Sequence, residues 1–143
     1  MRNTNLLGVA TLVVTAPFYV LVLMWQYRAA KTARFLGLPA ARSPGLGVGS
    51  WFIPVVNLWF PYQAIRDCLP PGHADRQVVN QMWACFIAVL IVNAVTQGLA
   101  WSGNRDGFVA GAIALALGAG FALSGVRAVR SIAAAHRALL GTA

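Results

Sequence analysis

The sequence contains no glutamate, and its acidic side chains are three aspartates, Asp67, Asp75 and Asp106. Charged residues make up 10% of the chain and hydrophobic residues 59%, whereas a soluble domain carries about 25% charge. General acid–base catalysis needs a positioned titratable pair, and this chain has almost no carboxylates to supply one. The composition therefore favours a membrane protein and disfavours an enzyme.

Ionisable residues are also missing from the interior of the three longest apolar runs, residues 6–27, 80–101 and 108–126. Proton relays and ion-coupled carriers normally keep such a group within the membrane. About 20 apolar residues cross a bilayer, so each run predicts a transmembrane helix. The first run is too long for a signal-peptide core, and Pro17 is expected to bend it.

Cysteine is scarce as well. Cys85 lies inside an apolar run and Cys68 lies beside charged residues, so we expect two free thiols. His73 and Asp75 could join Cys68 as metal ligands, but nothing else in the sequence supports a zinc site. We predict no metal and no cofactor.

Positive charge is abundant, with eleven Lys or Arg residues and a formal net charge of +8. A nucleic-acid-binding protein would gather these cations on one face of a soluble fold. Here apolar runs separate them, as in membrane proteins whose flanks face anionic headgroups. We expect a lipid bilayer as partner and no nucleic acid.

The stretch from Trp51 to Asp67 is apolar but is interrupted by Pro54, Asn57 and Pro61. Proline breaks a helix, and irregular backbone survives in hydrocarbon only against protein or water. Residues 48–65 are therefore predicted to re-enter the membrane or to lie along its interface, sheltered by other helices. The motif residues of this segment are Trp51, Pro54, Asn57, Trp59, Pro61, Tyr62 and Arg66.

Nine of the eleven cations fall in three flanks, which the positive-inside rule places in the cytoplasm. The C-terminus is then cytoplasmic, and the N-terminus and residues 102–106 are outside. Both ends of segment 48–65 lie inside; a fourth crossing by this segment would put a basic flank outside. These nine cations are Arg28, Lys31, Arg34, Arg42, Arg66, Arg76, Arg127, Arg130 and Arg137.

Three of these cations, Arg28, Lys31 and Arg34, recur at three-residue spacing along one side of a helical extension that ends near Gly37. We call them the basic ridge. The ridge could hold a lipid headgroup or phosphate, or it could serve only as a topology-setting flank. Residues 40–49 follow as a predicted loop, in which the glycines let the backbone turn tightly.

Two further features lie within the later runs. Asn93 and Gln97 share a helix face and could line a polar path, grip Asn57, or bond a neighbouring helix. Small residues also form a stripe suited to close helix packing, within the chain, with a partner or with a second copy. The stripe consists of Gly107, Gly111, Ala114, Gly118, Ala122 and Gly125.

The run W-F-I-P-x-x-N-L-W-x-P-Y-Q-A covers residues 51–64. Together with several matches between residues 25 and 49, it resembles domain-of-unknown-function family 4328, small helical membrane domains found mainly in actinobacteria. The resemblance implies four spans, one of them before Leu6, and implies no activity. Thr32 and Asp67 depart from it, because the family more often shows Asn and Glu there. The further matches are Trp25, Arg28, Ala33, Leu36, Gly37, Ser43, Pro44, Gly45, Gly49 and Arg66.

We therefore predict one all-α membrane domain over residues 1–143, with three transmembrane helices and a proline-broken re-entrant or interfacial segment. It is placed in the cytoplasmic (inner) membrane as a multi-pass protein. The expected role is a non-enzymatic membrane subunit or scaffold that binds a partner protein. The alternative is a small transport or lipid-handling protein that uses the segment around Asn57.

Overall fold

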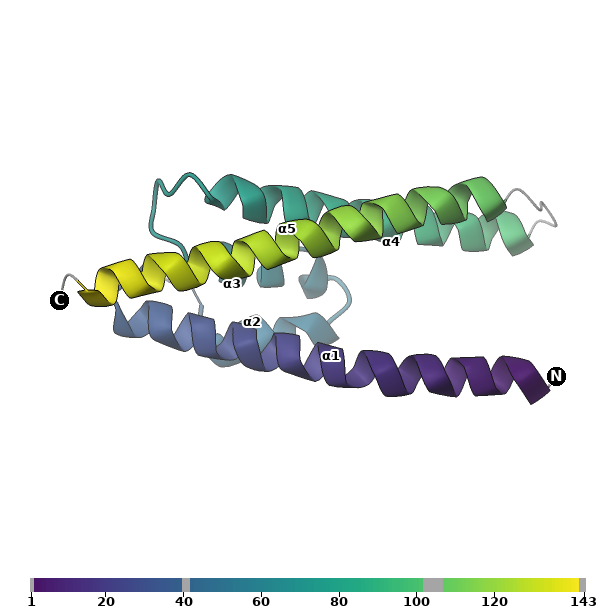
Figure 1. Cartoon of the computed structure of the whole chain (residues 1–143), viewed down its shortest axis with the longest axis horizontal. Helices are drawn as coiled ribbons and strands as arrows, with labels where there is room; N and C mark the ends of the chain where they lie inside the picture. The colour runs from purple at the N-terminus through teal and green to yellow at the C-terminus, as the bar shows by residue number, and fades with distance from the viewer. Residues whose placement is uncertain (1, 40–41, 102–106, 142–143) are drawn as a thin grey trace.

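The computed structural model describes residues 2–39, 42–101 and 107–141, with side chains at 13, 16–39, 42–98 and 109–141. Within these residues the chain is all-α. Long helices lie side by side, and short helical pieces fill the space between them (Figure 1). The elements are α1 (Arg2–Phe35), α2 (Pro44–Gly49), η1 (Ser50–Phe52), η2 (Val56–Leu58), α3 (Phe60–Arg66), α4 (Arg76–Trp101) and α5 (Gly107–Gly141).

The helices α4 and α5 form an antiparallel hairpin, because only residues 102–106 connect them. They approach closely at Gly120, where an added Cβ would lie 3.3 Å from Cys85 Sγ. Phe86 and Phe121 also meet across the hairpin, with ring centroids 5.8 Å apart. Small and aromatic side chains thus pack α4 against α5.

The buried core lies at one end of the molecule, where the second half of α1, the start of α4 and the last third of α5 converge (Figure 1). Away from this end the apolar side chains are open: Leu115 is 77% exposed and Val109 is 62% exposed. The molecule is therefore tightly packed at one end and splayed at the other. The core consists of Ala29, Ala30, Ala33, Ile65, Cys68, Leu69, Val79, Met82, Trp83, Ala128, Ile132 and Ala135.

Among the described residues, two helices are long and apolar enough to cross a membrane, Arg76–Gly98 and Val109–Gly141. Their most apolar windows are only 17% and 6% buried inside the structure, whereas the core helix of a soluble protein is mostly buried. The prediction of three spans is corrected to two. Residues 6–27 belong to α1, where several side chains lie outside the described residues. The structure therefore supports two spans among the described residues, and the span predicted over residues 6–27 falls partly outside them.

The chain between α1 and the interrupted segment also differs from the prediction. As expected, α1 ends next to Gly37, which adopts φ +70°. The predicted loop over residues 40–49, however, is wrong in its second half, because Pro44–Gly49 is the helix α2. Ser43 caps it, accepting a hydrogen bond from the backbone N–H of Leu46 at 3.3 Å, and Pro44 stands at its first position.

Replacement of Ile132 by Ala tests where stability resides. Ile132 is 1% exposed, and truncation of a buried aliphatic side chain costs about 2–5 kcal/mol. The same change at Ile113, which is 47% exposed on the same helix, creates a much smaller cavity. We expect Ile132→Ala to lower the unfolding midpoint in detergent clearly and Ile113→Ala to leave it nearly unchanged. Equal losses would contradict a core confined to one end.

Candidate functional site

Segment 44–66 is an interrupted chain of short helical pieces, as the prolines predicted. Ile53, which precedes Pro54, is extended, with φ −105° and ψ 111°, because proline disfavours helical geometry in the residue before it. Pro61 stands in the first turn of α3, where its missing N–H leaves no helical bond unmade. The two prolines thus separate η1 from η2 and begin α3.

The segment leaves the packed end of the molecule and returns to it, lying between α1 and α4 (Figure 1). Its two arms touch where α2 crosses α3: a Cβ added to Gly47 would lie 3.0 Å from the Cβ of Ala64. No such crowding by described atoms exists at Gly45. Glycine at position 47 is what lets the two arms approach.

A buried amide from α1 fastens the first arm. Gln26 is 1% exposed; its Oε1 accepts a hydrogen bond from Trp51 Nε1 at 2.7 Å, and its Nε2 donates to the Gly47 carbonyl at 3.2 Å. The same carbonyl accepts the Ser50 hydroxyl at 2.8 Å. Sequence reasoning missed Gln26, although a lone amide between Trp25 and Tyr27 at the end of an apolar run marks its position.

Aromatic residues fasten the rest of the segment to α4. Trp83 Nε1 donates to the Leu58 carbonyl at 3.0 Å, and the Trp83 ring lies 5.9 Å from that of Trp51. Farther along, the Tyr62 hydroxyl donates to Asn80 Oδ1 at 2.8 Å. These bonds satisfy backbone and side-chain groups that the broken helix leaves without partners.

Asn57 is the polar residue at the tip of the segment. Its backbone N–H donates to the Ile53 carbonyl at 2.7 Å, while its Oδ1 is shielded from solvent and accepts no hydrogen bond from the described part of the chain. Asn57 and Asn93 are not hydrogen-bonded to each other. Asn93 Nδ2 instead donates to the Val89 carbonyl of its own helix at 2.9 Å. Asn93 lies about 15 Å farther along α4 than Trp83, which contacts the segment.

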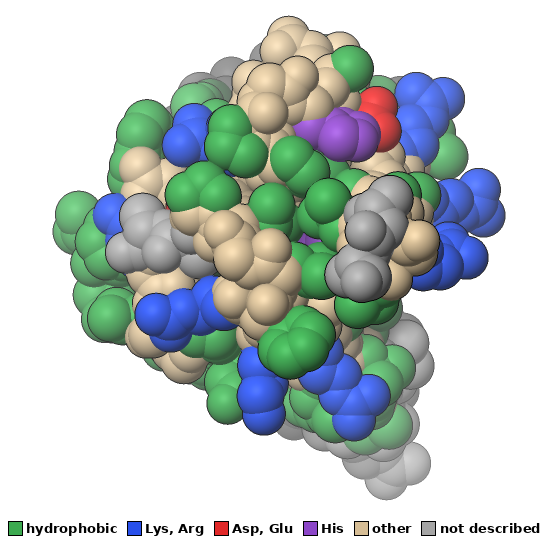
Figure 2. Space-filling model, turned by 90° about the vertical axis from the view of Figure 1, so that its left-hand side faces the viewer, with side chains coloured by type: hydrophobic (Ala, Val, Ile, Leu, Met, Phe, Trp, Pro, Cys, Tyr) green, Lys and Arg blue, Asp and Glu red, His purple; other side chains and the backbone are tan. Residues whose placement is uncertain are grey.

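The described cations gather at the packed end and lie around its rim (Figure 2). Those nearest the segment have partners: the Arg42 guanidinium lies 3.8 Å from the Phe60 ring centroid and donates to Gln63. Arg66 and Arg76 lie 3.8 and 4.0 Å from Asp67 Oδ1. The basic ridge differs, because its three exposed side chains make no hydrogen bond or ion pair with any described residue.

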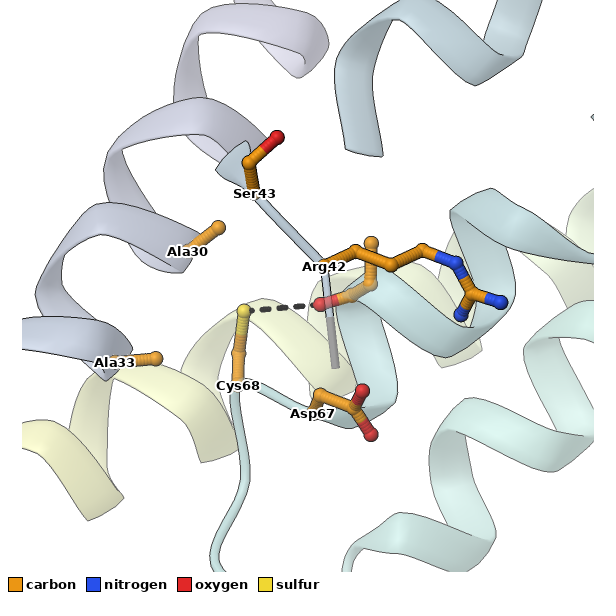
Figure 3. A pocket seen from close by; sticks show the side chains of 7 residues that line it. Ala30, Ala33, Arg42, Ser43, Asp67 and Cys68 are labelled. Atoms are coloured by element: carbon orange, nitrogen blue, oxygen red, sulfur yellow. Dashed lines mark hydrogen bonds between the residues drawn. The ribbon is translucent and has the colours of Figure 1, made fainter. Parts of the chain in front are cut away.

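Cys68 lines a small cavity between α1 and α3, together with Ala30, Ala33 and Asp67; Arg42 extends away from the two alanines (Figure 3). The cavity measures about 10 Å³, which is room for one water molecule. The Cys68 thiol donates to the Ala64 carbonyl at 3.2 Å. Burial, and to a lesser degree the Asp67 carboxylate, raises its pKa from 9.0 to about 12, so the thiol stays protonated at neutral pH.

The metal-ligating residue types are not gathered. Within the residues that the structure describes, no group of three His, Cys, Asp or Glu side chains lies close enough to hold a metal ion. His73 Nδ1 instead accepts the backbone N–H of Asp75 at 3.2 Å. His136, which is 7% exposed, places Nε2 2.8 Å from the Cys68 carbonyl and ties the end of α5 to the core.

The small-residue stripe is only partly used within the chain. An added Cβ at Gly125 would lie 3.8 Å from Met82 Sδ, whereas one at Gly111 or Gly118 would have no described atom within 4 Å. Among the described glycines of α5, the most crowded is Gly120, which the predicted stripe omits. Gly107 begins α5, Ala114 is half-buried and Ala122 is exposed.

These features define a helical domain with two candidate membrane-spanning helices, an interrupted segment fastened between its rods, and a basic end. The chain belongs to the DUF4328 family (Domain of unknown function), whose model matches residues 3–134. The likeness noted at residues 25–67 thus extends over most of the chain. No curated protein and no solved structure matches it.

The Gln26 amide offers a direct test of how the segment is held. Gln26→Leu removes two hydrogen bonds and leaves the Trp51 indole N–H without its acceptor, a loss of about 1–3 kcal/mol. We expect amide hydrogen exchange in residues 44–58 to accelerate at least tenfold. Gln81→Leu, at an exposed amide on α4, is the control and leaves this exchange unchanged. Unchanged exchange in Gln26→Leu would show that the amide does not hold the segment.

Proposed function

We propose that the protein is a multi-pass protein of the cytoplasmic membrane in which α4 and α5 cross the bilayer. The low burial of both helices within the chain supports this, because a surface of Leu, Ile and Val that stays open in the monomer suits lipid. The collection of the cations at one end supports a cytoplasmic position for that end and for the C-terminus. Residues 102–106, which lie outside the described residues, are then external.

In this orientation, segment 48–65 dips into the membrane from the cytoplasmic side. Support comes from its shape, because it departs from the basic end and returns there (Figure 1). Its outer surface is apolar, with Phe52 74% and Val55 79% exposed, while its freed polar groups bond to Gln26 and Trp83. Such internal satisfaction is the condition for irregular backbone at membrane depth.

The role we propose is that of a non-enzymatic membrane subunit or scaffold that binds a partner protein. The observation that carries it is an open, partly polar surface on the candidate spans. Gln97 is exposed and makes no hydrogen bond with described residues, while Gly111 and Gly118 have open space beside them. In lipid, helices associate through small residues and interhelical amide bonds, so a partner helix or a second copy of this chain would cover this surface.

One observation favours a second candidate, a small transport or lipid-handling function. The shielded Asn57 Oδ1, at the tip of the segment, accepts no hydrogen bond from the described residues. A polar group of a solute or lipid would satisfy it once the side chains that cover it move aside. Loss of flux in Asn57→Leu, with a stable monomer, would favour this candidate over the subunit.

Cysteine labelling tests the membrane topology. In a background with Cys68 and Cys85 replaced by Ser, we expect His73→Cys and Asn104→Cys to react with an impermeant maleimide from opposite faces of inverted and right-side-out vesicles. The reason is that a single crossing of α4 separates the two positions. Reaction from the same face would contradict the proposed crossing.

Partner binding is tested by enlarging the open glycine. Gly118→Leu places a branched side chain where a close-packed partner would lie, so we expect it to release a companion that co-purifies in mild detergent, weakening association at least tenfold. Ala119→Leu, an exposed neighbour on another face of α5, is the matched control and keeps the companion. A protein that purifies alone and unassociated in both forms would contradict the subunit role.

A further inference from the structure

A groove runs along α1 on the side that faces α2, and the functions considered above do not use it. Its volume is about 320 Å³, within the range of ligand-binding pockets, and its lining is almost wholly apolar. The lining residues are Val20, Leu23, Met24, Tyr27, Arg28 and Val48.

The order of these residues along α1 gives the groove a direction. Val20, Met24 and Arg28 are separated by four residues and so lie in one row on the helix, about 12 Å long. The apolar members come first, and Tyr27 and Arg28 come last, toward the basic end. The groove is therefore an apolar slot whose end nearer the basic end is formed by Tyr27 and Arg28.

The cation at this mouth is available to a ligand. Arg28 is exposed and has no hydrogen-bond or ion-pair partner among the described residues. Lys31 follows it one turn later and also has no partner in the part of the chain that the structure describes. The described carboxylates lie elsewhere, Asp67 near Arg66 and Arg76, and Asp75 near His73. A fork of five N–H donors with no acceptor among the described residues suits a phosphate.

From these observations we propose that the groove binds one anionic phospholipid, with an acyl chain along Val20 and Met24 and the phosphate on Arg28 and Lys31. The inference rests on the proposed membrane location, which puts the apolar part of the groove at acyl depth and the basic ridge at headgroup level. A free phosphate would leave the apolar slot empty, and a neutral lipid would leave the cations unpaired. The charge and the lining together specify an amphiphile.

Lipid retention measures this binding. The full chain is reconstituted with equal amounts of phosphatidylglycerol and phosphatidylcholine of the same acyl chains, then re-extracted in mild detergent, and the retained lipids are counted by mass spectrometry. We expect wild-type protein to retain phosphatidylglycerol preferentially. Arg28→Gln reduces that retention about fivefold, the effect of one cation near a headgroup. Val48→Trp fills the groove and abolishes retention of either lipid.

The control is Arg130→Gln, which removes an exposed cation of α5 that has no partner among the described residues, and this variant is expected to retain lipid as wild type does. Equal losses in Arg28→Gln and Arg130→Gln would mean general electrostatic attraction and would overturn the groove. Displacement of the lipid by millimolar inorganic phosphate would mean a headgroup site only, which also overturns it. If Arg28→Gln lowers the yield of folded protein, Arg28→Lys is compared with wild type instead. Because it keeps the charge, Arg28→Lys is expected to retain most of the lipid.

Alkaline extraction of the same membranes separates this inference from the proposed function. Protein that stays in the membrane but shows no lipid preference would overturn the phospholipid site alone. Protein that alkaline buffer releases would overturn the proposed membrane crossing together with the site.

Discussion

The buried amide of Gln26 is the interaction on which the arrangement of the interrupted segment depends. It accepts from the Trp51 indole and donates to the Gly47 carbonyl, so it holds one arm of the segment to α1. The indole of Trp83 does the same for the other side, through the Leu58 carbonyl. Burying a polar group in a low-dielectric interior costs much more free energy when the group has no hydrogen-bond partner. Because these bonds supply partners, a segment broken by two prolines can lie among apolar helices.

Packing in the molecule follows the solvent that each part meets. At the basic end, removing apolar side chains from water stabilises the fold, and α1, α3, α4 and α5 contribute to a common core. The His136 side chain contacts the Cys68 carbonyl at the edge of this core. Along the candidate spans, lipid would be as apolar as the side chains themselves, so burial within the chain brings little gain. This small gain explains why no described atom crowds Gly111 or Gly118.

Local chemistry explains what the sequence could predict. Proline geometry anticipated the interruptions at Pro54 and Pro61, and apolar run length anticipated α4 and α5. The helix α2 was missed because its glycines suggest a loop, although Ser43 followed by Pro44 is a recognisable helix start.

Gln26 and Gly120 were missed for a different reason. Their importance depends on which helix face turns toward a neighbour, and that rotation is set by the assembled structure. The predicted stripe from Gly107 to Gly125 does not include Gly120, the most crowded of the described glycines of α5. For Asn57, the amide was visible in the sequence, and its unpartnered oxygen only in the structure.

The continuity of α5 has a mechanical consequence. Its 35 residues form one helix, about 52 Å long, with no proline and no break where the candidate span meets the packed end. Such a rod moves as a unit, so a tilt imposed near Val109 swings the other tip, where His136 touches the turn after α3. A displacement of α5 near Val109 would therefore move its His136 end without a conformational change within the helix.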